Sequence, residues 1–189
     1  MKTFGLIGKT LSHSFSQEYF QEKFYKENIS DCQYLNFEIN DISKIKYLIK
    51  TNNVSGLNIT IPYKSSVTPF LDFISEDAKE IGAVNTIKII DGKLHGFNTD
   101  IIGFEKSITP ILKNRKTALI LGNGGASKAI QFVLSKLNVN YKIVSRNTYF
   151  DYHNIDKEIM ESSDIIINTT PLGTYPKTSE RSEERRVGK

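Results

Sequence analysis

The chain has 189 residues, of which 39% are apolar and 24% are charged, and its formal net charge is +4. This composition supports a packed core and excludes an intrinsically disordered chain. The single cysteine, Cys32, excludes an intrachain disulfide and a cysteine-held metal cluster, and it fits a reducing, cytoplasmic location. Because the charge surplus is small and no apolar run is long enough to span a bilayer, we expect neither a nucleic-acid nor a membrane partner.

Residues 1–100 alternate between strand and helix patterns. The apolar run at 4–8 predicts a buried strand, and Tyr19, Phe20 and Phe24 recur at helical spacing in the segment after it. Asp91-Gly92 between two alternating runs predicts a β-hairpin. The expected strands are 4–8, 33–38, 54–61, 83–90 and 93–97, and the expected helices are 17–28, 42–49 and two short stretches after Pro62.

A second α/β unit follows a helix expected at 100–112. Its expected strands are 117–121, 141–144 and 164–167, with helices at 126–137 and 155–160. Because strands alternate with helices in both halves, we predict the α/β class with mostly parallel sheets.

A glycine-rich turn joins the strand at 117–121 to the next helix. Glycines at 122 and 124 permit a tight turn and a close approach of backbone to a pyrophosphate, whose negative charge the helix N-terminus favours. The third glycine position of the usual pattern holds Ser127, which is still small enough for close packing. The turn therefore predicts a dinucleotide site, although many strand–helix turns need glycine for structural reasons alone.

The end of the second strand indicates which dinucleotide is bound. An NAD site usually carries an acidic residue there to accept from the ribose 2′-hydroxyl. This chain has Ser145-Arg146-Asn147 instead, and a guanidinium pairs well with a 2′-phosphate. The sequence thus favours NADP(H), with a solvated arginine at a strand end as the alternative.

Polar residues gather after the strands of the first half. In open α/β sheets ligands bind beyond the carboxyl ends of the strands. Hydroxyls, amides, a lysine and an aspartate at these places suit a small polyhydroxylated acid. These residues are Ser12, Ser14, Asn58, Thr60, Lys64, Asn85 and Asp100.

In their order and spacing these motifs resemble those of the shikimate dehydrogenase family. The resemblance covers about residues 3–176 and rests on the Ser-x-Ser loop, Asn58-x-Thr60-x-Pro62-x-Lys64, Gly82-Ala83-Val84-Asn85-Thr86, Gly96-x-Asn98-Thr99-Asp100, Gly122-x-Gly124-Gly125-Ala126-Ser127 and Asn168-Thr169-Thr170-Pro171-Leu172-Gly173. It implies an oxidoreductase that reversibly reduces 3-dehydroshikimate to shikimate with NADPH, in the biosynthesis of chorismate and aromatic amino acids.

The resemblance also implies a division of labour along the chain. Residues 1–100 would form the substrate-binding and catalytic domain, 101–116 a connecting helix and linker, and 117–180 a partial Rossmann-type cofactor domain. With only three strands in that domain, we expect an incomplete form of the enzyme, ending in an unrelated tail at 181–189.

Site residues carry over from the family position by position. Ser12 and Ser14 would bind the substrate carboxylate, and the ring hydroxyls would be held by Asn58, Thr60, Asn85 and Asp100. Lys64 and Asp100 match the catalytic pair, with Lys64 as proton donor to the developing alkoxide. The matching cofactor residues are Gly122, Asn123, Gly124, Gly125, Ala126 and Ser127 at the pyrophosphate, Ser145, Arg146 and Asn147 at the 2′-phosphate, and Thr169, Thr170 and Leu172 beside the nicotinamide; no metal site is expected.

Other interpretations remain at this point. Taken alone, Lys64 reads as a surface lysine and Asp100 as a helix N-cap. A quinate/shikimate-type enzyme or a folate-linked dehydrogenase would share the two-domain architecture, though the latter is not expected to combine the serine loop with Asn58-x-Thr60-x-Pro62-x-Lys64. A non-catalytic substrate-binding fragment is the alternative from a different class.

Overall fold

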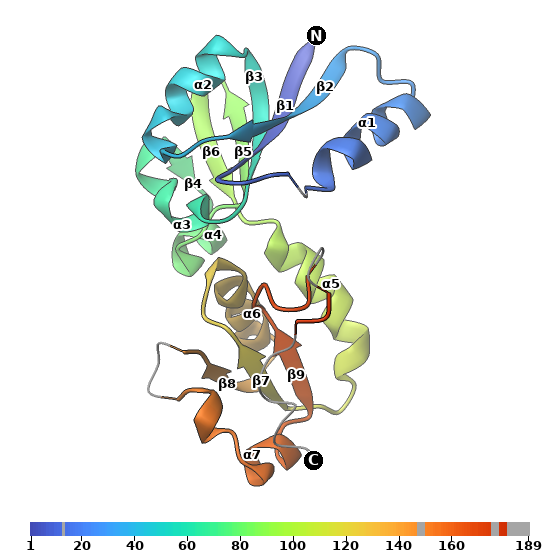
Figure 1. Cartoon of the computed structure of the whole chain (residues 1–189), viewed down its shortest axis with the longest axis vertical. Helices are drawn as coiled ribbons and strands as arrows, with labels where there is room; N and C mark the ends of the chain where they lie inside the picture. The colour runs from blue at the N-terminus through green and yellow to red at the C-terminus, as the bar shows by residue number, and fades with distance from the viewer. Residues whose placement is uncertain (13, 147–149, 175–177, 181–189) are drawn as a thin grey trace. The chain divides into compact units, whose positions relative to one another are not determined.

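The computed structural model describes residues 1–12, 14–146, 150–174 and 178–180 of the chain. These residues form two compact units, Met1–Thr99 and Asp100–Lys189 (Figure 1). Within the described residues no helix is long and apolar enough to cross a membrane.

The first unit is built on a six-stranded sheet with strand order β2-β1-β3-β5-β6-β4. β1 runs parallel to both of its neighbours, and the antiparallel β5 turns back between β3 and β6. The mostly parallel α/β sheet expected from the sequence is therefore confirmed. The strands are β1 (Lys2–Gly8), β2 (Cys32–Glu38), β3 (Val54–Ile59), β4 (Phe73–Ile74), β5 (Thr86–Ile90) and β6 (Lys93–Phe97).

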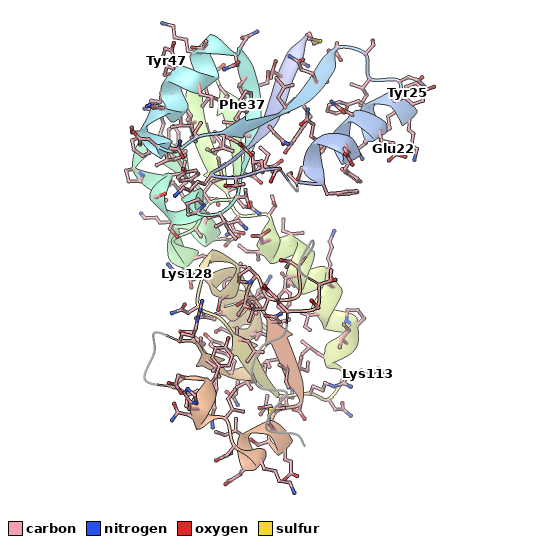
Figure 2. The ribbon with its side chains drawn as sticks, in the orientation of Figure 1. Glu22, Tyr25, Phe37, Tyr47, Lys113 and Lys128 are labelled. Carbon is pink, nitrogen blue, oxygen red and sulfur yellow. The ribbon has the colours of Figure 1, made fainter. Side chains whose placement is uncertain are left out.

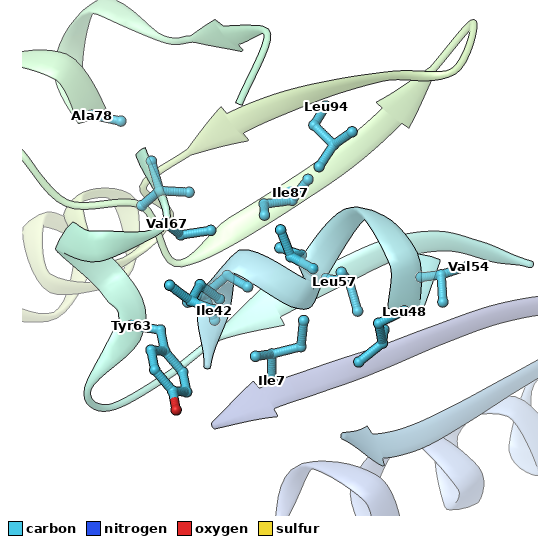
Figure 3. Packing of buried hydrophobic residues seen from close by; sticks show 13 residues of the cluster. Ile7, Ile42, Leu48, Val54, Leu57, Tyr63, Val67, Ala78, Ile87 and Leu94 are labelled. Carbon is cyan, nitrogen blue, oxygen red and sulfur yellow. The ribbon is translucent and has the colours of Figure 1, made fainter. Parts of the chain in front are cut away.

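Helices cover both faces of this sheet, as the alternation of β1 requires. Because successive side chains of a strand point to opposite faces, Leu6 and Ile7 enter different clusters. Ile7 packs beneath α2 with Leu57 and Ile87 (Figure 3), whereas Leu6 packs toward the aromatic side chains of α1. The helices of this unit are α1 (Ser16–Lys26), α2 (Ile45–Thr51), α3 (Tyr63–Ser66) and α4 (Glu76–Ile81), with 3-10 turns η1 (Ile42–Lys44) and η2 (Thr68–Phe70).

The helix expected at 17–28 is α1, and its aromatic residues divide between two environments. Phe20 and Phe24 pack against the sheet, as their helical spacing predicted. Tyr25 is 85% exposed and lies with Glu22 on the outer side of the helix (Figure 2).

The Asp91-Gly92 turn predicted from the sequence lies between β5 and β6. Asp91 and Gly92 both adopt positive φ, 49° and 74°, which is the backbone of a type I′ hairpin turn joining β5 to β6. The two-residue strand β4 was not expected, because two residues are too few to show an alternating pattern. It pairs with β6 in parallel at the sheet edge.

The second unit has a three-stranded parallel sheet in the order β8-β7-β9. Helix α5, expected as a connector, belongs to this unit and packs against α6. The opposite side of β7 contributes Leu119 and Leu121 to a cluster with Val144 and Ile155. The elements are α5 (Asp100–Leu112), β7 (Thr117–Leu121), α6 (Gly125–Lys136), β8 (Asn140–Val144), η3 (Tyr152–Asn154), α7 (Lys157–Glu161) and β9 (Ile165–Asn168).

The core of the first unit predicts a contrast between two isoleucines of β5. Ile87 is 1% exposed and Ile90 is 36% exposed. Ile87→Ala should lower the free energy of unfolding by about 2–5 kcal/mol, because it removes buried methyl groups and leaves a cavity. Ile90→Ala is the matched control and should cost less than about 1 kcal/mol. Chemical denaturation measures both, and equal losses would contradict the packing described.

Candidate functional site

A chain of polar side chains crosses the sheet of the first unit from β2 to β3 and β5. The Tyr34 hydroxyl donates to Asn58 Oδ1 at 2.8 Å. Asn58 Nδ2 in turn donates to Thr86 Oγ1 at 3.4 Å, across the β3–β5 pair. The Asn58 amide is therefore held from both ends.

This series of hydrogen-bonded side chains continues through Asn85 to the residues that follow β6. Asn85 is 8% exposed, and its Oδ1 accepts from the Thr86 hydroxyl at 2.9 Å. The same oxygen accepts from the backbone N–H of Thr99 at 2.8 Å and from the Thr99 hydroxyl at 3.1 Å. Since its oxygen is fully engaged, Asn85 offers a ligand only the N–H groups of its amide.

Tyr34 anchors this chain from inside the unit. Burial raises the pKa of its phenol to about 12, and a hydrogen bond with the Ser16 side chain partly opposes that rise. The phenol is therefore neutral over the whole physiological range and keeps its proton for Asn58. Ser16, the first residue of α1, was not among the expected site residues.

The serines expected to bind a carboxylate lie in a different cavity. Ser12 and Ser14 line a polar cavity of about 510 Å³ together with Asn36 and Glu38. Asn58 and Thr86 instead line an apolar cavity of about 730 Å³ beside α1. The Ser14 hydroxyl accepts from the Ser16 backbone N–H at 3.3 Å, which ties the serine loop to the first residue of α1.

Backbone bonds hold the other expected residues. Thr60 N–H donates to the carbonyl of Ile7 at 2.9 Å, which ties the end of β3 to β1. The carbonyl of the half-buried Lys64 accepts from Val84 N–H at 2.7 Å, which fixes α3 against the segment before β5. Lys64 belongs to the first unit, and Asp100 opens α5 of the second.

The glycine-rich turn of the second unit has the backbone that a phosphate loop needs. Gly122 has φ +103°, and a Cβ there would lie 2.6 Å from Thr169 Oγ1. Gly124 is the N-cap of the 12-residue helix α6, and no described atom lies within 4 Å of where its Cβ would be. Gly124 thus leaves room for a pyrophosphate to approach the start of α6, where the first N–H groups of a helix have no partners within the helix. The other expected residues of the turn surround it, with Asn123 and Ala126 exposed, Gly125 at the first helical position and Ser127 fully buried.

Beside this turn lies a cavity of about 490 Å³ lined by Arg146, Asp151, His153, Thr170 and Leu172, among others. Arg146 is exposed and follows the buried Ser145. Asp151 was not expected here, and its carboxylate caps η3 by accepting from His153 N–H at 2.8 Å. Thr169 bonds the carbonyl of Leu121, and Asn147 lies outside the described residues.

Four residues of the first unit's candidate site were not among those expected from the sequence. Thr86 and Thr99 stand inside motifs that it singled out, so their hydroxyls could have been included. Ser16 could have been found only as a second Ser-x-Ser pair, because Ser12, Ser14 and Ser16 share one spacing. The sequence did not indicate a polar role for Tyr34, because an aromatic residue in a strand is ordinarily part of the core.

Comparison with known proteins matches the chain to one family. The profile of the shikimate dehydrogenase substrate binding domain matches residues 6–87. The shikimate dehydrogenase (NADP(+)) of Clostridium beijerinckii is 41% identical over 95% of this chain and 72% of its own length. A shikimate dehydrogenase structure from Peptoclostridium difficile is 39% identical, with a TM-score of 0.82 over 93% of this chain and 69% of its own. A shikimate dehydrogenase in complex with NADP+ is 32% identical, with a TM-score of 0.80 over 96% of this chain and 70% of its own.

The glycine turn predicts that two alanine substitutions differ in their effect on stability. Gly122→Ala should lower the free energy of unfolding of the second unit by about 1–3 kcal/mol, because its positive φ is unfavourable for alanine and the new methyl group meets Thr169. Gly124→Ala is the matched control, since its Cβ would meet no described atom. Thermal unfolding followed by circular dichroism measures both, and a larger loss at Gly124 would contradict the described turn.

Proposed function

We propose that this chain, which belongs to the shikimate dehydrogenase family, uses the residues described above to interconvert 3-dehydroshikimate and shikimate with NADP(H). The observation that carries the proposal is the hydrogen-bonded chain through Asn58, Thr86, Asn85 and Thr99. It presents amide donors beside the strand ends, where a small hydroxylated acid would bind. The Clostridium beijerinckii relative is named a shikimate dehydrogenase (NADP(+)), and a further relative was solved with NADP+; this chain is accordingly an NADP-dependent oxidoreductase acting on a CH–OH group.

The first unit is the proposed substrate domain. Its amides, from Asn58 and Asn85, would donate to ring oxygens, with Thr60 and Asp100 as further partners. Ser14 is proposed for the carboxylate, together with Ser16, whose backbone N–H donates to the Ser14 hydroxyl. Ser12, which is exposed, is proposed at the rim of the serine cavity.

Lys64 and Asp100 are the proposed catalytic pair. The cofactor supplies a hydride to the carbonyl carbon in the reductive direction or accepts it in the reverse direction. The Lys64 ammonium would then give a proton to the developing alkoxide, and it would take that proton back during oxidation. Asp100 would hold the ammonium and the reacting hydroxyl in place. Thr99, bonded to Asn85 and directly before Asp100 in the chain, supports this placement.

The second unit is the proposed cofactor domain. Gly122, Asn123, Gly124, Gly125, Ala126 and Ser127 would hold the pyrophosphate through backbone N–H groups. Arg146, with Ser145 and Asn147, would hold the 2′-phosphate, and Thr169, Thr170 and Leu172 would lie beside the nicotinamide. We further propose that the enzyme works in the cytoplasm, where reducing conditions suit the free thiol of Cys32.

Arg146→Ala tests the cofactor assignment. Loss of one charge-assisted contact should weaken NADP+ binding by about 10- to 150-fold and leave NAD+ binding nearly unchanged. Isothermal titration calorimetry with each nucleotide measures this. Lys136→Ala is the control, because Lys136 is an exposed cation at the far end of α6, paired with Glu105. Equal losses for both nucleotides would show that Arg146 does not read the 2′-phosphate.

Lys64→Ala tests the chemistry. Removing the proton donor should lower kcat for shikimate oxidation by about 10²- to 10⁴-fold, with a much smaller change in substrate affinity. Steady-state kinetics with shikimate and NADP+ measure both constants, and Lys79→Ala on the exposed side of α4 is the control. An unchanged kcat with a raised KM would make Lys64 a binding residue only.

A further inference from the structure

Tyr34 is the buried end of the polar chain in the first unit. Its side chain is 2% exposed, and its ring stacks on Phe20 of α1 with 4.4 Å between centroids. The stacking fixes the ring between α1 and the sheet, so the hydroxyl has one position available to it. Beside that position stand Asn58 of β3 and Ser16 of α1.

The hydroxyl determines which end of the Asn58 amide faces it. A phenol has a single proton, and Tyr34 donates that proton to Asn58 Oδ1 at 2.8 Å. The amide oxygen is thereby turned inward. The Nδ2 group is left on the opposite side, where one hydrogen bonds Thr86 Oγ1 and the second remains to donate.

We propose that Tyr34 is a positioning residue for substrate recognition, because it locks the Asn58 amide as a hydrogen-bond donor toward the ligand. The proposal rests on the proposed function, in which Asn58 contacts a ring oxygen of shikimate. Without the hydroxyl, nothing holds the Asn58 oxygen inward, so the amide can turn by 180° and present its Nδ2 group to the ligand for only part of the time. Tyr34 also stacks on Phe20 of α1, so the same side chain contacts α1 through its ring and β3 through its hydroxyl.

A double-mutant cycle separates this role from a purely structural one. Tyr34→Phe keeps the ring and its stacking on Phe20 and removes only the hydroxyl. Dissociation constants for shikimate are measured by calorimetry for the wild-type chain, Tyr34→Phe, Asn58→Ala and the double variant. NADP+ binding to each variant reports on the folding of the second unit, and circular dichroism reports on the whole chain.

We expect Tyr34→Phe to weaken shikimate binding by about 3- to 30-fold, which lies within the range of couplings between contacting side chains. In the Asn58→Ala background the same change should have less than about a 2-fold effect, since there is no amide left to orient. Tyr63→Phe is the matched control. Tyr63 is 6% exposed and its hydroxyl donates to the carbonyl of Ile39, so its loss should affect stability but not shikimate affinity.

Two results would overturn the inference. If Asn58→Ala weakens binding but Tyr34→Phe does not, or if the two effects simply multiply in the double variant, Tyr34 does not act through Asn58 and the proposed function stands. If Asn58→Ala leaves shikimate affinity unchanged, both the inference and the proposed role of Asn58 fall.

Discussion

Parallel strand pairing is the constraint on which both units depend. Parallel neighbours end at the same edge of a sheet, so residues that follow them in the sequence come together in space. In the first unit, the pairing of Ile7 with Ile59 brings the loop after β1 beside Thr60 and the segment leading to Lys64. In the second, Leu121 pairs with Val144 on one side and Asn168 on the other, so Gly122, Ser145 and Thr169 begin three adjacent loops. In both units, parallel strand pairing thus brings the loops that follow the strands together.

The polar side chains of the first unit are costly to bury, so each must have hydrogen-bond partners, and these partners fix its orientation. A buried amide without partners costs roughly 1–3 kcal/mol, so such groups persist in folded proteins where their bonds are satisfied. Asn85 meets this demand with three donors to one oxygen, and Asn98, 6% exposed, meets it by donating to the carbonyl of Ala83 at 3.0 Å. Side chains held in this way cannot reorient freely when a ligand arrives. If this network is the proposed substrate site, it is preorganised, which reduces the entropy lost on binding.

The two units offer different kinds of groups for binding a ligand. In the proposed site of the first unit, side-chain amides and hydroxyls would recognise a hydroxylated acid. In that of the second, backbone N–H groups at the start of α6 would bind the phosphates, for which the side chains must be small or absent. Gly122 illustrates this, since its positive φ and its contact with Thr169 leave no room for a Cβ. Arg146, which lines the cavity at the neighbouring strand end, is the residue proposed to bind the 2′-phosphate.

The sequence by itself determined the α/β class, the Asp91-Gly92 hairpin and the glycine turn, because each depends on residues adjacent in the chain: a period of two or 3.6, or a backbone angle that glycine or aspartate tolerates. It also indicated Asn58, Asn85 and Arg146, which stand directly at strand ends. Only the tertiary structure brought Tyr34 to Asn58, 24 residues away, stacked Phe20 of α1 on the same ring and placed Ser12 and Ser14 in a cavity of their own. Nothing in the local pattern marks these partners, because hydrogen bonds between α1, β2 and β3 exist only once packing has set the distance and direction between the elements.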